Sequence, residues 1–185
     1  LVVVTGVSGT GKTTLGLGLS QELGIPFLDA DDFHPAANIE KMSAGEPLTD
    51  ADRLPWLASL AAKLVEMEGK GGAVLACSAL KNAYRELLQV SENLRWIHLI
   101  GDRDLIRQRM LARQNHYMKA GLLDSQLAVW EQPRVGHSVA ISGTQAEVLE
   151  VSLHYLKMQN MKMNMGVIGM GVMGKSLALN LAENG

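Results

Sequence analysis

The sequence predicts an α/β fold in which a five-stranded parallel sheet is flanked by helices. Short runs of aliphatic and β-branched residues alternate along the chain with longer segments of helical period. Each run is apolar throughout, as expected of strands buried on both faces, and the intervening helices imply right-handed crossovers between parallel strands. The predicted strands are residues 1–5, 26–30, 73–77, 95–100 and 137–142.

Helices are predicted between these strands, at residues 12–23, 55–67, 105–112 and 145–156. Together the elements form one doubly wound domain over about residues 1–157, and a chain of 185 residues with 47% hydrophobic content can bury such a core. The 17 Lys and Arg residues are balanced by 19 Asp and Glu, which leaves no general basic surface for a nucleic acid. We therefore expect local motifs to carry the chemistry.

Cys77 is the only cysteine of the chain, which excludes an internal disulfide and predicts a reducing compartment, with the cytoplasm as the expected location. Its place in the third predicted strand indicates a small buried residue and not a nucleophile. No apolar run approaches the roughly 20 residues that a membrane-spanning helix needs. The first segment, LVVVTG, is too short and lacks the basic flank of a signal peptide, so no membrane partner is expected.

A glycine-rich phosphate loop follows the first predicted strand directly. It has the spacing G-x-x-x-x-G-K-[ST], with a strand before it and a helical pattern after it, as this motif requires. Its glycines let the backbone turn N–H groups toward phosphate oxygens, and the helix start adds its positive end. The predicted ATP-binding residues of this loop are Gly6, Val7, Ser8, Gly9, Thr10, Gly11, Lys12 and Thr13.

Two side chains of this loop have expected roles in phosphoryl transfer. Lys12 would lie along the β- and γ-phosphates as a catalytic point charge, and the Thr13 hydroxyl would be a ligand of Mg²⁺. The alternative is a glycine-rich turn that only joins a strand to a helix, and the full spacing with its Lys-Thr pair argues against it. A P-loop alone does not separate kinases from switches or motors.

Carboxylates follow the second predicted strand, at the edge where open α/β sheets bind ligands. Because side chains alternate along a strand, Asp29 and Asp31 are expected on one face. Asp29 could help to order the Mg²⁺ shell, and Asp31 could accept the proton of an attacking hydroxyl or hold neighbouring hydroxyls. Asp32 is expected to cap the following helix. His34 either donates to a substrate hydroxyl or is structural, and Trp56 is expected in the core.

Several segments spread over most of residues 1–133 resemble gluconate kinase. They are DADDFHP at 29–35, NIEKM at 38–42, GEPLTDADRLPWL at 45–57, CSALKNAYRELL at 77–88 and LLDSQ at 122–126. The resemblance implies the shikimate-kinase-like form of the P-loop fold, and transfer of a phosphoryl group from ATP, with Mg²⁺, to the 6-hydroxyl of D-gluconate. Dimerisation is common in that family, so a homodimer is a further expectation.

The substrate implied by this resemblance carries one carboxylate and several hydroxyls, and it therefore needs a fixed cation. Arg53 fits that role because a guanidinium can grip a carboxylate at two points, whereas the alternative is a surface ion pair with Asp50 or Asp52. The family pattern also makes Lys81 and Arg85 substrate binders, four residues apart on one helix face. A solvated basic face is the alternative for this pair.

A lid is expected after the fourth strand, because in similar kinases this region folds over ATP. Its cations would stabilise charge on the γ-phosphoryl oxygens while closure excludes water. Arg109 is expected to bind ATP and Arg113 to act in catalysis, with solvated arginines as the alternative. Residues 118–121 and 134–142 depart from the family pattern, and residues 143–144, after the fifth strand, are the expected adenine-binding loop.

A second glycine motif follows a polar, methionine-rich linker at residues 158–164. From residue 165 the chain has a short apolar run, the spacing G-x-G-x-x-G at Gly169, Gly171 and Gly174, and a helix start, which together open a Rossmann unit. These residues resemble the amino terminus of 6-phosphogluconate dehydrogenase, which consumes the product of gluconate kinase. Residues 165–185 are therefore expected to be the start of a fused dinucleotide-binding domain, and NADP is expected only with the complete domain.

Together with these motifs, the resemblance to gluconate kinase implies a gluconokinase that uses ATP and Mg²⁺, whereas composition and spacing alone predict a kinase for a small hydroxylated acceptor. Two alternatives stay open. One is a shikimate-type or other small-metabolite kinase, and the other is a nucleotide-binding sensor that has kept the P-loop but lost turnover. The altered lid favours the sensor, whereas the carboxylate and basic residues on the acceptor side argue against it.

Overall fold

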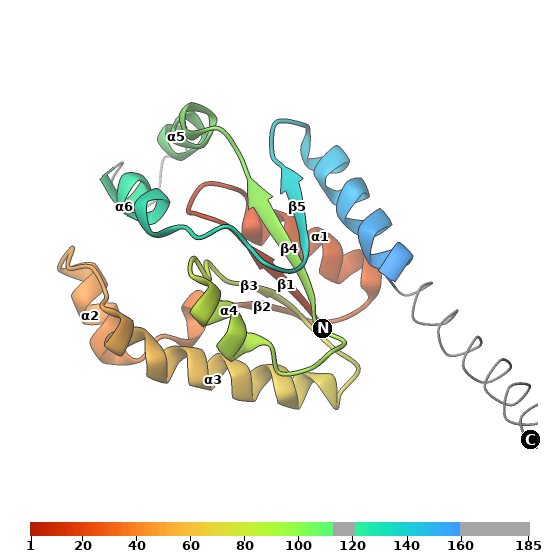
Figure 1. Ribbon diagram of the computed structural model, residues 1–185, viewed down its shortest axis with the longest axis horizontal. Helices are drawn as coiled ribbons and strands as arrows, with labels where there is room; N and C mark the ends of the chain where they lie inside the picture. Colours follow the sequence, from red (N-terminus) through yellow and green to blue (C-terminus); the bar gives the residue numbers. More distant parts are fainter. Residues whose placement is uncertain (113–120, 160–185) are drawn as a thin grey trace, which may run out of the picture. The chain divides into compact units, whose positions relative to one another are not determined.

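The computed structural model describes residues 1–112 and 121–159. It confirms the α/β prediction: five parallel strands form one sheet in the order β2-β3-β1-β4-β5 (Figure 1). The strands are β1 (Val2–Thr5), β2 (Phe27–Asp29), β3 (Val74–Ala76), β4 (Arg95–Ile100) and β5 (His137–Ala140). The helices are α1 (Lys12–Leu23), α2 (Ala36–Ser43), α3 (Asp50–Glu68), α4 (Asn82–Leu88), α5 (Arg103–Leu111) and α6 (Gly121–Val129), with a 3-10 turn η1 (Ala30–Phe33).

The chain divides into two compact units, Leu1–Leu149 and Glu150–Gly185, and the sheet and the P-loop belong to the first. Residues 145–159 are helical. The predicted Rossmann start, with its three motif glycines, lies outside the described residues. Among the helices of the described ranges, none combines the length and the apolar character that crossing a membrane requires.

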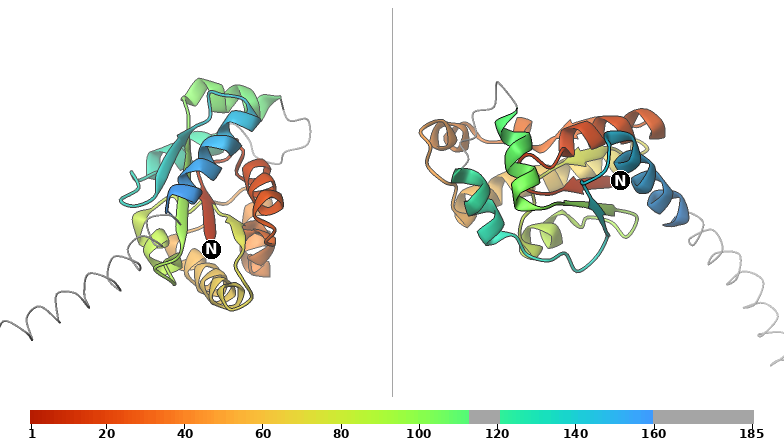
Figure 2. Two further views of the ribbon diagram at one scale, coloured as in Figure 1. Left: turned by 90° about the vertical axis from the view of Figure 1, so that its right-hand side faces the viewer. Right: turned by 90° about the horizontal axis from the view of Figure 1, so that it is seen from above.

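The order of the strands places a ligand-binding edge beside β1. After β1 the chain forms β2 and β3 on one side of that strand and then β4 and β5 on the other side. The winding direction therefore reverses next to β1. Open α/β sheets bind ligands at the carboxyl ends of the strands near such a reversal. The loop after β1 is the P-loop, and the loops after β2 and β3 carry the predicted acceptor residues. α2 and α6 also lie beyond the carboxyl ends of the strands (Figures 1 and 2).

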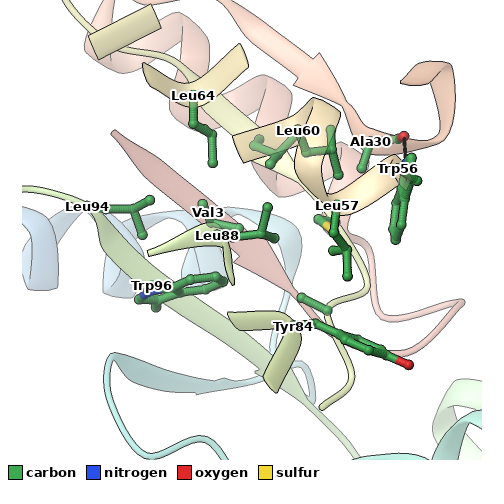
Figure 3. Close-up of a cluster of buried hydrophobic side chains, with 13 residues drawn as sticks. Val3, Ala30, Trp56, Leu57, Leu60, Leu64, Tyr84, Leu88, Leu94 and Trp96 are labelled. Atoms are coloured by element: carbon green, nitrogen blue, oxygen red, sulfur yellow. Dashed lines mark hydrogen bonds between the residues drawn. The ribbon is translucent and has the colours of Figure 1, made fainter. Parts of the chain in front are cut away.

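Helices cover both faces of the sheet, with α1 and α4 on opposite sides (Figure 2). On one face, Val3 pairs in register with Leu75 and Trp96, and these buried side chains join the cluster contributed by α3 and α4 (Figure 3). The α3 members of this cluster recur at helical spacing, Trp56, Leu57, Leu60 and Leu64. Trp56 is 3% exposed and donates its indole N–H to Ala30 O at 2.8 Å, which confirms its predicted place in the core.

The start of α3 differs from the prediction. The helical period predicted a helix that begins at Pro55. Instead, a capping box begins the helix at Asp50: Thr49 Oγ1 accepts from Asp52 N, and the Asp52 carboxylate accepts from Thr49 N. Pro55 therefore lies inside the helix.

Cys77 is buried directly after β3, and burial raises the pKa of its thiol to about 12. A thiol in that environment stays protonated and unreactive at neutral pH. Its predicted role as a small buried residue is confirmed.

Candidate active site

The P-loop connects β1 to α1 and passes close to β4. Gly6 has φ +148°, and a Cβ at this position would lie 2.8 Å from Leu99 O, so only glycine fits. The buried Thr10 hydroxyl donates to Val7 O at 2.8 Å and closes the loop from inside. The Thr10 side chain and the Val7 carbonyl are thus used for the loop's own structure, and the Thr10 backbone N–H also donates to Val7 O, at 3.4 Å. Lys12 Nζ donates to the same Val7 carbonyl at 3.1 Å.

The two predicted metal ligands lie next to each other. Thr13 Oγ1 donates to Asp29 Oδ2 at 3.3 Å, which joins the start of α1 to the end of β2. A hydroxyl and a carboxylate oxygen are hard donors of the kind that Mg²⁺ takes beside substrate phosphates, so the pair fits this ion. In the part of the chain that the structure describes, no group of three acidic, histidine or cysteine side chains could hold a metal alone.

A cavity of about 480 Å³ lies beside the P-loop, and its lining includes Gly9, Gly11, Arg109, Gly143 and Leu149. Arg109 reaches it from α5 and donates to Ile141 O at 2.7 Å. The lining thus brings together the glycine loop, the predicted ATP-binding arginine and the predicted position of the adenine loop. Its size suits a nucleoside. Arg113, the predicted catalytic arginine of the lid, lies outside the described residues.

The acidic segment after β2 is folded differently from the strand that was predicted. The strand ends at Asp29, whose carboxylate caps η1 by accepting from Asp31 N at 3.1 Å. The expectation that Asp29 and Asp31 share a strand face is therefore wrong, and so is the expected cap at Asp32, because Pro35 precedes α2. The cap nevertheless keeps Asp29 and Asp31 adjacent at the carboxyl edge of the sheet.

The pKa of the Asp31 carboxyl is raised above its usual value by partial desolvation and then by the Asp29 carboxylate. Because the side chain is 84% exposed, repulsion from Asp29 is the firmer of these two causes. His34 and Lys12 act in the opposite direction, so both groups are within electrostatic range of Asp31.

His34 is largely enclosed, with its side chain only 6% exposed. Its ring stacks on Trp56 with centroids 4.3 Å apart, and its Nδ1 lies 3.4 Å from Asn38 Nδ2. The other ring nitrogen, Nε2, lies 3.9 Å from Asp31 Oδ1. Burial lowers the pKa of His34, with Arg53 acting in the same direction, so the neutral ring is favoured. One edge of the ring is therefore structural, and the other faces Asp31.

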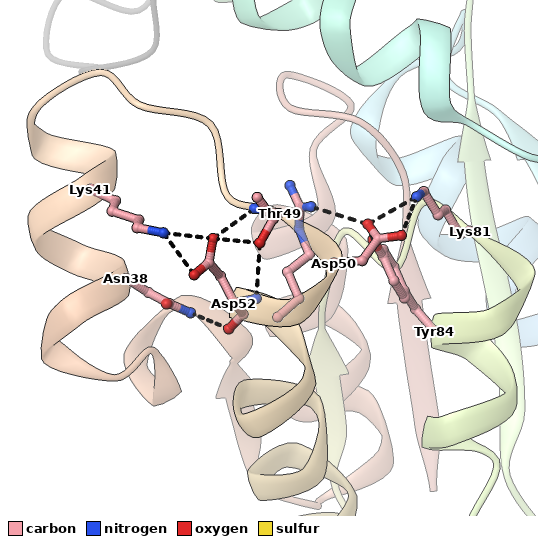
Figure 4. Close-up of polar contacts among 8 residues, drawn as sticks. Asn38, Lys41, Thr49, Asp50, Asp52, Lys81 and Tyr84 are labelled. Atoms are coloured by element: carbon pink, nitrogen blue, oxygen red, sulfur yellow. Dashed lines mark hydrogen bonds and ion pairs between the residues drawn. The ribbon is translucent and has the colours of Figure 1, made fainter.

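A cluster of two cations and a tyrosine surrounds Asp50 at the start of α3 (Figure 4). Lys81 Nζ lies 2.9 and 2.7 Å from the two Asp50 oxygens, and the Tyr84 hydroxyl donates to Oδ1 at 2.5 Å. Arg53 Nη1 is farther away, at 3.7 Å from Asp50 Oδ1. The hydrogen bonds from Lys81 and Tyr84 lower the pKa of Asp50, which keeps it a carboxylate. The Arg53–Asp50 pair considered from the sequence is thus present, but it is loose.

A second network holds α2 against α3 and fixes the start of α3 (Figure 4). The Asp52 carboxylate accepts from Lys41 Nζ at 2.8 and 2.9 Å, and Asn38 Nδ2 donates to Asp52 O at 2.9 Å. These hydrogen bonds, with those from Thr49, hold the pKa of Asp52 well below its usual range. This network positions Arg53, the next residue along the helix.

Lys81 and Arg85 do not share a helix face. Lys81 is the residue before α4 and has an extended backbone, whereas Arg85 is turned inward and is 4% exposed. Arg85 donates to Asn82 Oδ1, Leu80 O and Glu131 O at 2.8 to 3.0 Å. The structure therefore brings Lys81 to the Asp50 cluster and places Arg85 behind it, as a support for the chain around residue 131.

Sequence reasoning gave no role to Gln126, although it belongs to the LLDSQ segment of the family resemblance. Its side chain reaches from α6 to the P-loop, where Ser8 N donates to Oε1 at 2.7 Å and Nε2 lies 3.1 Å from Ser8 Oγ. No pattern in the sequence indicates a contact between residues 118 positions apart. Its place in the LLDSQ segment is the only signal that could have found it.

The fold and this site define a P-loop enzyme that transfers a phosphoryl group to a small molecule. The family model described as shikimate kinase matches residues 8–133. A gluconokinase from Gluconobacter oxydans is 50% identical over 134 residues, which cover 71% of this chain and 75% of that protein. A probable gluconokinase from Dictyostelium discoideum is 40% identical over 172 residues, with 85% and 86% covered. The chain belongs to the gluconokinase family.

A solved structure supports the same assignment. The crystal structure of a gluconokinase from Sinorhizobium meliloti 1021 superposes with a TM-score of 0.82 at 37% sequence identity. The match covers 89% of this chain and 95% of that one. The predicted family and the shikimate-kinase-like fold are both confirmed.

Proposed function

We propose that this chain is a gluconokinase, which transfers the γ-phosphoryl group of ATP to the 6-hydroxyl of D-gluconate and gives 6-phospho-D-gluconate and ADP. The observation that carries the proposal is the position of Asp31. Its carboxylate is within electrostatic range of Lys12 and its Oδ1 lies 3.9 Å from His34 Nε2, in a chain whose relatives carry the name gluconokinase. A hydroxylated acceptor bound there would face the end of the triphosphate.

The nucleotide would be held by backbone and by two cations. The N–H groups of residues 6–13 and the start of α1 would receive the phosphates, and the cavity lined by Gly143 and Arg109 would receive the nucleoside. Lys12 would leave Val7 O and lie along the β- and γ-phosphates. Arg113 is proposed to add a lid cation at the γ-phosphoryl group.

Thr13 and Asp29 would hold Mg²⁺, Thr13 directly and Asp29 through water. When bound, the ion neutralises charge on the phosphate oxygens. The hydrogen bond between the two side chains aligns their oxygens in advance. This is a contribution of the chain itself, because it fixes the donors before the ion arrives.

Asp31 would orient the 6-hydroxyl and accept its proton. A raised pKa makes a carboxylate a stronger proton acceptor, and the exposure of Asp31 leaves its oxygens accessible to a substrate. The facing edge of neutral His34 would hydrogen-bond a neighbouring hydroxyl. Asp29 supports the base by repulsion and by fixing the backbone at Asp31 N.

Arg53 would grip the gluconate carboxylate, since its contact with Asp50 is loose enough to be exchanged for a substrate. Lys81 is a weaker candidate because Asp50 already accepts from it with both oxygens. Arg85 is proposed to affect substrate binding only indirectly, by supporting the segment around residue 131.

The remaining proposals concern the rest of the chain. Residues 1–157 would form the kinase domain, residues 158–164 a linker and residues 165–185 the start of a dinucleotide-binding domain that takes NADP only when complete. What supports this is the G-x-G-x-x-G spacing and the change of composition at the linker. A homodimer in the cytoplasm is proposed on the family resemblance and on the single, buried cysteine.

Product identification tests the proposed function. The chain is incubated with ATP, Mg²⁺ and either D-gluconate or shikimate, and the products are analysed by ³¹P and ¹³C NMR. We expect one new phosphomonoester on C6 of gluconate and no product from shikimate. Phosphorylation of shikimate would favour a kinase of that type, and ATP binding without either product would favour a sensor.

A further inference from the structure

We propose that Gln126 belongs to the phosphoryl-transfer site, where its side-chain amide occupies the place of a γ-phosphate oxygen at Ser8 and exchanges with that oxygen when ATP binds. The inference rests on the proposed function as a kinase. It starts from the bidentate contact in which Ser8 N donates to Gln126 Oε1 at 2.7 Å and Gln126 Nε2 donates to Ser8 Oγ at 3.1 Å.

Ser8 N–H is a phosphate-binding donor by its place in the chain. It lies between Gly6 and Lys12, in the loop whose backbone N–H groups converge on phosphates in this motif. A carboxamide oxygen is an acceptor with partial negative charge, and it can use the same donor as a phosphate oxygen. A phosphate that bonds to Ser8 N–H must therefore displace Gln126 Oε1.

The side of the P-loop on which Ser8 lies indicates which phosphate of the nucleotide would displace Gln126. The nucleoside cavity is lined along α1 by Gly11, Thr14 and Gly18, and within the described residues neither Ser8 nor Gln126 belongs to its lining. Ser8 instead faces α6. A nucleotide whose base lies in that cavity and whose phosphates run along the loop toward Ser8 would meet Gln126 with its terminal phosphate.

α6 is fixed near both ends, so the exchange needs only a rotation of the Gln126 side chain. Near its start, Arg103 of α5 donates to Asp124 Oδ1 at 3.0 and 2.7 Å. Just after its end, Glu131 N donates to Leu80 O at 2.9 Å, and Arg85 lies 4.8 Å from the centre of the Trp130 ring. The displaced amide stays near the loop, where Nε2 can donate to an oxygen of the transferring group.

If this arrangement is correct, a substitution at residue 126 should change the affinity for ATP and the affinity for ADP by different amounts. ADP has no γ-phosphate and leaves the contact between Gln126 and Ser8 in place. Gln126→Glu keeps an acceptor for Ser8 N–H, but its carboxylate repels the γ-phosphate. We expect the Kd of a non-hydrolysable ATP analogue to rise about tenfold or more, with the Kd of ADP changed less than about threefold.

Gln126→Ala removes both the competing acceptor and the donor to the transferring group. The ATP analogue should bind as well as in the wild type or more tightly, while kcat with gluconate falls about tenfold or more. A residue that only tethers α6 would instead alter the binding of both nucleotides together. The two substitutions thus separate a phosphate-contacting role from a structural one.

Calorimetric titration of the full chain with Mg²⁺-ADP and with the Mg²⁺-bound ATP analogue tests the proposal, with Gln132→Glu as control. Gln132 is exposed, and its substitution by Glu introduces the same charge six residues after Gln126. A selective loss of the ATP analogue in Gln126→Glu alone supports the inference. Equal losses for both nucleotides, or none, overturn it. These titrations need no gluconate, so a failure of the proposed acceptor would show separately, in the product analysis.

Discussion

The contacts of Asp50 determine which cation on the acceptor side is available to bind a substrate. Both of its oxygens accept from Lys81, and Oδ1 also accepts from Tyr84. Arg53 is held less closely, at 3.7 Å from the carboxylate and 5.9 Å from the Tyr84 ring centre. At the scale of single residues, Arg53 is therefore the cation that can exchange its partner for a gluconate carboxylate at the lowest cost.

Arg53→Lys should raise the KM for gluconate about tenfold or more and leave the KM for ATP unchanged, because lysine keeps the charge but loses the bidentate grip. Steady-state kinetics with either substrate varied would measure both constants. Arg134→Lys is the matched control, since Arg134 forms an exposed ion pair with Glu86. An unchanged KM for gluconate in Arg53→Lys would assign the carboxylate to another residue.

At the scale of elements, the junction between α2 and α3 positions the acceptor side. Asp52 accepts four hydrogen bonds there, two from Lys41 Nζ and two from Thr49. Arg53 follows directly on the same helical turn. The capping box therefore serves both to start the helix and to place the substrate-binding cation.

Asp52→Ala should lower the free energy of unfolding by more than Asp104→Ala does, because it removes the capping box and the bonds to α2. Urea unfolding followed by circular dichroism would measure the loss. Asp104→Ala is the control, since Asp104 is also an exposed acidic residue in the first turn of a helix, α5. If the two variants lost the same stability, the network would contribute no more than a favourable charge at a helix start.

The elements show where sequence reasoning succeeds and where it fails. All five strands were predicted to within one or two residues, because an apolar run bounded by turn residues has few other interpretations. Full burial holds for β1 and β3 but not for the edge strands β2 and β5. The start of α3 was missed because the capping box at Thr49 and Asp52, which precedes Pro55, was not considered. Lys81 and Arg85 were placed on one face because their spacing suits a helix, but the helix begins after Lys81.

The site was predicted in its local motifs and missed in its long-range contacts. The P-loop and the carboxylate segment after β2 are each contiguous in sequence, so a local motif points to each of them, although it does not give the fold of the second. Gln126 meets Ser8 only through the packing of α6, and Arg85 turns inward only because the chain at Glu131 passes over it. Such contacts depend on tertiary structure, which one sequence does not reveal.

At the scale of the whole molecule, a buried histidine ties the sheet to the connection before β5. His98 is 0% exposed in β4, with Nδ1 2.6 Å from Thr5 Oγ1 and Nε2 2.8 Å from Val135 O. Nε2 therefore carries the proton and Nδ1 accepts from the threonine. Burial lowers the pKa of His98 to about 4, so the folded protein keeps this ring neutral.

Stability should consequently fall on acidification. An unfolded chain protonates this histidine below its ordinary pKa of about 6.5, whereas the folded chain does not until about 4. The contribution is fully present above about pH 6.5, and up to about 3 kcal/mol of it is lost between pH 6.5 and 4. Chemical unfolding measured across this range should show a flatter pH profile for His98→Gln than for the wild type. His154→Gln, at an exposed position, should retain the wild-type slope.

Gluconate-dependent ADP release by the wild type and by Asp31→Asn, measured side by side with shikimate and with no acceptor, tests the central claim most directly. We expect turnover with gluconate alone, and a loss of kcat of about a hundredfold or more in the variant, whose amide cannot accept the proton. Near-normal turnover in Asp31→Asn would contradict the role of Asp31, and no stimulation of the wild type by gluconate would contradict the account as a whole.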